Sequence, residues 1–279
     1  MIKLSKLKIA SALTIAAMYS ACQPSANAGA TLVSSNLKMT GSSKAATVAQ
    51  QSPRGKLSLL LNQALAFVSP GIVDSNSASI NLTNAWVVIK EIEFEAAETE
   101  GAEEVDGSEV AFEGPYYVDL LSNNPVTLDT QPIPDNAYKR MKMKLHSSSA
   151  ALPSGVPSEL LGNSIFVQGT VGANNFTFLL DDSTELSIAG ANPIVPAEGA
   201  SLLVEVNLAN IFKQIDMSSV TNNEVISHTN RHAGFNLCAS IDASANDLYT
   251  CIRKGLETHS DFGEDKDGND DLEPSEDVH

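Results

Sequence analysis

The stretch Ala85–Ala96, AWVVIKEIEFEA, carries the clearest structural signal in the chain. In its second half, Ile92 and Phe94 alternate with three glutamate residues. Side chains of a β-strand point to opposite faces with a period of two residues, so this half predicts a strand with one buried and one solvated face. The first half, Trp86–Ile89, is apolar at every position, which indicates that both of its faces are covered.

Short apolar runs separated by turn residues continue through the chain. Tyr138–His146 alternates apolar with basic residues, so we expect its basic face to lie beside the glutamates of Ala85–Ala96. Ile165–Val171 and Asn175–Leu180 predict a hairpin. Helices are scarce before Leu208–Ile215, although Asn62–Val68 fits either a strand or a helix. The pattern therefore predicts a mainly β fold, an antiparallel β-sandwich with a short C-terminal helical region. The expected core includes Trp86, Ile89, Ile92, Phe94, Met141, Met143 and Leu145.

Four segments go beyond a simple strand pattern. They are INLTNAWVVIKEIEFEA (80–96), YYVDLLS (116–122), PIPDNAYKRMKMKLH (132–146) and SLLVEVNLANIFK (201–213). Together they resemble a family of uncharacterised domains in bacterial surface lipoproteins. The resemblance spans about residues 56–213 and implies a β-sandwich of the transthyretin or immunoglobulin type. Its motifs are structural rather than catalytic, so it implies a fold and a compartment only.

The N-terminus predicts export. Residues 1–21 have three early lysines followed by the apolar run Ile9–Ala21, the pattern of a signal peptide. Tyr19–Cys22 resembles the site at which bacterial lipoproteins are cleaved and acylated, which makes Cys22 the expected lipidation site. Ala26–Ala28 offers an alternative site, for ordinary secretory cleavage. We expect an exported, membrane-anchored lipoprotein of the bacterial envelope, periplasmic or at the cell surface.

Composition divides the rest of the chain. Residues 22–55, rich in small and polar residues, predict a flexible tether in which Thr31–Met39 is the one candidate for a brief strand, and residues 56–215 predict the β-sandwich domain. Residues 216–256 form a C-terminal extension, and 257–279 an acidic tail that we expect to be disordered. Without the signal peptide the chain has 14 basic and 34 acidic residues, a net charge of −20. Such acidity argues against nucleic acid as a partner.

Cys238 and Cys251 are the only cysteines besides Cys22. In an exported chain, two remaining cysteines predict one disulfide, and two separate buried thiols are the alternative. Residues 242–256 predict a helix, because Leu248, Ile252 and Leu256 recur at a spacing of four.

The acidic tail contains the spacing of a calcium loop. Counted from Asp265 as position 1, the ligand positions 1, 3, 5, 7 and 12 are occupied by Asp265, Asp267, Asn269, Asp271 and Glu276. Position 6, where glycine normally permits a sharp turn, is Asp270, and the glycine is Gly268. The alternative is a solvated run of charge, so calcium is the only cofactor that the sequence suggests.

Catalytic signatures are absent from the sequence: there is no nucleophile elbow, phosphate loop or dinucleotide-binding turn. His228 and His232 lie four apart, but no third zinc ligand is evident. We therefore expect a non-enzymatic lipoprotein that is attached to the membrane through its lipid and binds a protein or a glycan. The alternatives are a structural or accessory subunit of an envelope assembly, or an enzyme of unrecognised type.

Overall fold

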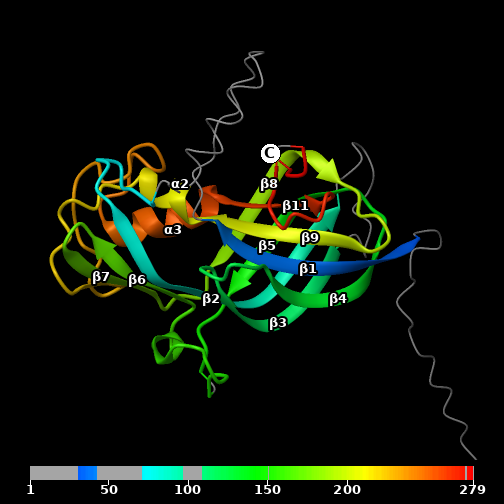
Figure 1. Ribbon diagram of the computed structural model, residues 1–279, viewed down its shortest axis with the longest axis horizontal. Coiled ribbons are helices and arrows are strands. Elements are labelled where there is room, and N and C mark those ends of the chain that lie inside the picture. The colour runs from blue at the N-terminus through cyan, green and yellow to red at the C-terminus, as the bar shows by residue number, and fades with distance from the viewer. Residues whose placement is uncertain (1–30, 43–70, 97–108, 150, 274, 279) are drawn as a thin grey trace, which may run out of the picture.

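The structure, a computed structural model, describes residues 31–42, 71–96, 109–149, 151–273 and 275–278 (Figure 1). The predicted signal peptide, Cys22 and residues 26–28 lie outside this part of the chain. The strands are β1 (Leu32–Ser42), β2 (Ile80–Ala96), β3 (Glu109–Asp119), β4 (Val126–Pro134), β5 (Tyr138–Leu145), β6 (Ile165–Val171), β7 (Asn174–Leu180), β8 (Glu185–Ile194), β9 (Ala200–Asn207), β10 (Glu224–Ile226) and β11 (Ser260–Asp265). The helices are η1 (Ser158–Leu160), α2 (Leu208–Lys213) and α3 (Leu248–Thr258).

These strands form two sheets. One has the order β11–β9–β1–β4, and the other has the order β10–β7–β6–β2–β5–β8, with β3 also paired to β2. The prediction of a mainly β fold with few helices is therefore confirmed. The expectation of purely antiparallel pairing is wrong, because β9 pairs with β1 and β10 with β7 in parallel. Both pairs join strands that are far apart in the chain, which leaves room for the crossover that parallel pairing needs.

β2 is the longest strand and lies at the centre of the larger sheet. Ile92 and Phe94 are buried on one face, as their alternation with glutamates predicts. Trp86 was expected in the main core, but it is only half-buried. It packs on the opposite face of the sheet, against a small second cluster of Val88, Leu160 and Phe166. The apolar run therefore has two covered faces, and the outer cover is thin.

The predicted pairing of acidic and basic strands is confirmed. Residues 91, 93 and 95 of β2 lie opposite residues 144, 142 and 140 of β5. Lys144 contacts both Glu91 and Glu93, with Nζ–Oε distances of 3.2 and 2.5 Å, and Arg140 Nη1 lies 3.0 Å from Glu95 Oε2. Because a shift of one residue would turn these side chains to the other face, the charges favour a single register.

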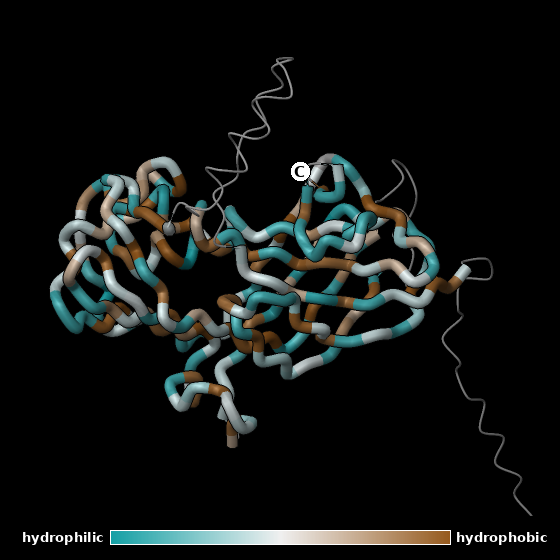
Figure 2. The backbone as a smooth tube through the Cα atoms, viewed as in Figure 1, coloured by the Kyte–Doolittle hydropathy of each residue, from teal (hydrophilic) through white to brown (hydrophobic). Residues whose placement is uncertain are grey.

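The two sheets share one apolar core. The Phe94 ring of β2 makes edge contacts with Phe112 of β3, Tyr138 of β5 and Phe262 of β11, at centroid distances of 5.8, 6.2 and 5.6 Å. Phe262 belongs to the four-stranded sheet, so this cluster joins the two sheets. Figure 2 shows the apolar stretches distributed over the strands of both sheets.

Two segments that were predicted as a flexible tether and a disordered tail are ordered parts of the fold. The brief strand expected at Thr31–Met39 is β1, which continues to Ser42 and is an inner strand between β9 and β4, with Leu37 and Met39 buried. The predicted acidic tail, 257–279, contains the end of α3 and all of β11. Glu276 and Val278 near its end are also buried. Backbone pairing with distant strands outweighs the polar composition of both segments.

Helices α2 and α3 cover the end of the larger sheet that contains β6, β7 and β10 (Figure 1). Phe212 of α2 packs on Phe176 of β7, and Tyr249 of α3 packs on Phe178, with centroid distances of 6.1 and 5.8 Å. α3 begins later than predicted, because the Asp247 side chain caps it by accepting a hydrogen bond from Thr250 N. No helix in the described ranges is long and apolar enough to cross a membrane.

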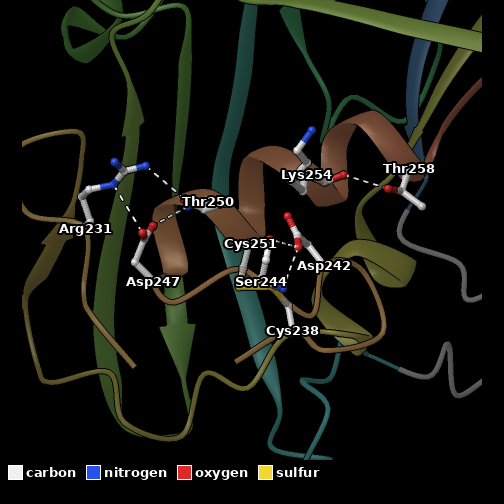
Figure 3. Close-up of a disulfide and its surroundings, with 9 residues drawn as sticks. All are labelled: Arg231, Cys238, Asp242, Ser244, Asp247, Thr250, Cys251, Lys254 and Thr258. Carbon is white, nitrogen blue, oxygen red and sulfur yellow. Dashed lines mark hydrogen bonds and ion pairs between the residues drawn. A yellow bond between two sulfur atoms is a disulfide. The ribbon is translucent and has the colours of Figure 1, made fainter. Parts of the chain in front are cut away.

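Cys238 and Cys251 form the predicted disulfide (Figure 3). Their Cα atoms are 5.7 Å apart, and both residues are buried. The bond joins the loop before α3 to the first turn of that helix. It therefore fixes the C-terminal extension against the domain.

Candidate metal centre

The candidate calcium loop begins where β11 ends. After Asp265 the chain turns away and returns along β11, where Glu264 N donates to Glu276 O (3.1 Å) and Val278 N to Phe262 O (3.3 Å). A Cβ on Gly263 would lie 2.2 Å from the carbonyl oxygen of Glu276, so only glycine allows this close return. The return brings position 12 of the loop back to position 1.

The turn itself is organised around the Asp265 carboxylate. It accepts hydrogen bonds from the backbone N–H groups of Gly268, Asn269 and Asp270, at 2.8, 3.1 and 3.3 Å. Asp270 occupies position 6 with a φ of 63°, the left-handed conformation for which glycine is usually required. Aspartate tolerates this conformation better than most residues, so the missing glycine does not prevent the turn.

Three of the five predicted ligands meet. Asp265, Asp267 and Glu276 each offer a carboxylate oxygen, and these oxygens lie within 4.8 Å of one another. Ca²⁺–oxygen bonds of 2.3–2.6 Å place two ligands of one ion at most about 5 Å apart, so the spacing suits this ion. The donors are all hard oxygens, which calcium prefers and zinc does not.

The other two predicted ligands have different roles. The Asn269 side chain donates to Asp267 Oδ2 (3.1 Å) and accepts from Asp271 N (2.8 Å), so it lies within the turn. The Asp271 carboxylate is not part of the group of three. The calcium-loop pattern assigns a backbone carbonyl to this position, and that role does not need the side chain.

The electrostatics of the loop favour a cation. Glu276 is buried, which raises the pKa of its carboxyl, but hydrogen bonds from Glu273 and from backbone N–H groups outweigh the burial and hold the pKa below its usual value. The same contact raises the pKa of Glu273. Nearby, burial and the charge of Asp271 raise the pKa of Glu205 on β9. The ammonium group of Lys38 also lies beside the loop, with its Nζ 2.8 Å from Asp270 Oδ1.

Sequence reasoning missed a second polar cluster. His232 does not pair with His228, whose ring packs on Tyr249 at 6.0 Å. The Nδ1 atom of His232 contacts Glu224 Oε1, and the Nε2 atom of His232 lies 2.9 Å from Ser219 Oγ. The three residues come from a turn, the start of β10 and the segment before α3, and they match no sequence motif, so only the structure brings them together.

Comparisons with family models, curated proteins and solved structures found no match.

Proposed function

We propose that this protein is an exported bacterial lipoprotein whose β-domain binds Ca²⁺ through the loop 265–276 and presents a surface to a protein or glycan at the cell envelope. The observation that carries the calcium proposal is the convergence of three carboxylates on a turn whose backbone N–H groups are hydrogen-bonded to Asp265. Sequence spacing and three-dimensional position agree on Asp265, Asp267 and Glu276.

Calcium at this loop would act on the fold as a clamp. Asp265 is the last residue of β11, and Glu276 lies near the end of the chain. An ion held by both would fix the C-terminal segment to β11. Since β11 pairs with β9, the clamp would also stabilise the edge of the four-stranded sheet.

Two further features support export. One is the disulfide, because such bonds persist in oxidising compartments. The other is the calcium loop, because extracellular modules bind Ca²⁺ at roughly 0.1–1 mM and the envelope is open to the medium. The two sheets with their shared core are also compatible with the transthyretin-like sandwich that the sequence resemblance implies.

The test is thermal unfolding of the mature protein with and without Ca²⁺, beside calorimetric titration. With a Kd of about 0.5 mM, 10 mM Ca²⁺ stabilises the folded state by about 1.8 kcal/mol, which raises the Tm by roughly 4–7 °C. The variant Asp265→Ala/Asp267→Ala should lose this shift. Glu159→Ala/Asp181→Ala, which removes two exposed carboxylates elsewhere, should keep it.

Two outcomes contradict the proposal. One is a parent protein whose Tm does not change in 10 mM Ca²⁺ and that gives no heat of binding. The other is a loop variant that responds to Ca²⁺ as strongly as the control variant does, which would assign the effect to general screening of the acidic surface.

A further inference from the structure

The cluster of Ser219, His232 and Glu224 has the connectivity of a catalytic triad. The imidazole of His232 lies between the other two side chains, with Nδ1 on the carboxylate and Nε2 2.9 Å from the hydroxyl oxygen. A carboxylate on Nδ1 fixes the tautomer that leaves Nε2 free to accept a proton. This is the order of groups that activates a serine in hydrolases of unrelated folds.

The fold holds each member in place separately. Ser219 lies in a turn that Val220 N closes on Met217 O (3.1 Å), and both of those flanking residues are buried. Glu224 begins β10, and its carboxylate accepts hydrogen bonds from the N–H (2.8 Å) and the hydroxyl (2.9 Å) of Thr221. These contacts leave the carboxylate one orientation, facing His232.

His232 is held by the start of α3. Its carbonyl accepts a hydrogen bond from Leu248 N (3.1 Å), and its φ of 52° lies in the left-handed region. A non-glycine residue there costs about 1–3 kcal/mol and persists only where the surroundings enforce it. The same helix is anchored by the disulfide, so the ring is presented by a stiff part of the molecule.

The burial and the charge of the three side chains suit these roles. Ser219 is exposed, whereas the side chains of His232 and Glu224 are only 13% and 11% exposed. Burial raises the pKa of Glu224, but hydrogen bonds from Thr221 and His232 outweigh it and hold the pKa below its usual value. The carboxylate is thus charged at neutral pH and stabilises an imidazolium when one forms.

We infer that Ser219 is the nucleophile of a carboxylic-ester hydrolase site, with His232 as general base and acid and Glu224 as the positioning carboxylate. Ser219 Oγ attacks the ester carbonyl carbon while His232 Nε2 takes its proton. The bond to the alcohol oxygen then breaks, and the alcohol leaves with that proton. Water attacks the acyl-serine through the same base, which releases the acid and restores the serine.

The surroundings favour esters of short acyl groups. Ser218 and Thr221, which lie near Ser219 in the chain, are exposed, small and polar. An open turn of this kind suits a small acyl group carried on a larger molecule. The expectation of a non-enzymatic protein was based on missing motifs, and triads are recognised by geometry rather than by sequence position. The site does not depend on the calcium proposal.

The experiment uses the mature protein with p-nitrophenyl acetate and a fluorophosphonate probe. We expect hydrolysis above that of heat-denatured protein, and a probe adduct on Ser219 by peptide mass spectrometry. Ser219→Ala should abolish the adduct, and both Ser219→Ala and His232→Gln should lower hydrolysis by about 100-fold or more. Ser218→Ala, which removes the adjacent exposed hydroxyl, should retain both the ester hydrolysis and the probe adduct on Ser219.

His228→Gln separates the site from general imidazole catalysis, because free histidines also cleave activated esters slowly. If His228→Gln and His232→Gln reduce hydrolysis equally, the inference is overturned. It is also overturned if the folded parent gives no adduct at Ser219, or if Ser219→Ala, melting as the parent does, hydrolyses the ester at the parent rate.

Discussion

Replacement of Phe94 by alanine tests how the two sheets are joined. Phe94 is 1% exposed, and its ring contacts aromatic rings from three other strands. A buried Phe→Ala change costs about 3–5 kcal/mol, and each aromatic edge contact adds about 0.5–1.5 kcal/mol beyond area burial. With three such contacts we expect the upper part of that range, about 4–5 kcal/mol. For a domain of this size the Tm then falls by roughly 8–20 °C.

The assay is thermal and urea unfolding followed by circular dichroism. Phe235→Ala is the matched control, because Phe235 is 87% exposed and its loss should change stability by no more than about 0.5 kcal/mol. A cycle with Phe262→Ala isolates the contact between sheets, with an expected coupling of about 0.5–1.5 kcal/mol. If Phe94→Ala melts within about 2 °C of the parent, the shared core described above is refuted.

Three further predictions concern separate parts of the chain. Cys238→Ala/Cys251→Ala should lower stability by about 3 kcal/mol in urea titrations, and an unchanged midpoint would exclude a constraining bond. Burial and neighbouring carboxylates hold the pKa of Glu205 above its unfolded value, so its ionisation destabilises the fold as pH rises. Glu205→Gln should therefore raise the Tm at pH 7 but not below about pH 4, and an equal shift at both pH values would rule out titration as the cause. Cys22→Ala should move the protein from the membrane to the soluble fraction, and persistence in the membrane fraction would disprove lipidation as the anchor.

Local patterns predicted the fold where neighbours in space are neighbours in the chain. The alternation in Ala85–Ala96 and the hairpin at Ile165–Leu180 are examples, because period and turn lie within a few residues of each other. At β1 only a brief strand was expected, because Ser35, a polar residue, occupies a buried position between Val33 and Leu37 and weakens the alternation. Its partner strands also lie more than 80 residues away, so no turn signals the pairing.

The two candidate sites differ in the same way. The calcium loop was predictable because its ligands follow one another at fixed spacing within twelve residues. The ordered structure of this loop was not predictable, because the burial of Asp265 and Glu276 depends on the return of the chain along β11. No sequence motif fixes the spacing between Ser219, Glu224 and His232. The contact between their side chains depends on the positions of β10 and α3 in the fold.

The position of β1 has a consequence for how the protein matures. In the four-stranded sheet Ser35 lies opposite Gln131 on one side and Ala200 on the other. A chain that emerges from its N-terminus therefore carries β1 without its parallel partner until about residue 207 has followed. Contacts so distant in sequence form slowly and leave apolar strands exposed in the meantime. Until then the apolar side chains of Val33, Leu37 and Met39 are open to other chains, so residues 31–42 are a segment that a chaperone would have to shield while the rest of the domain is made.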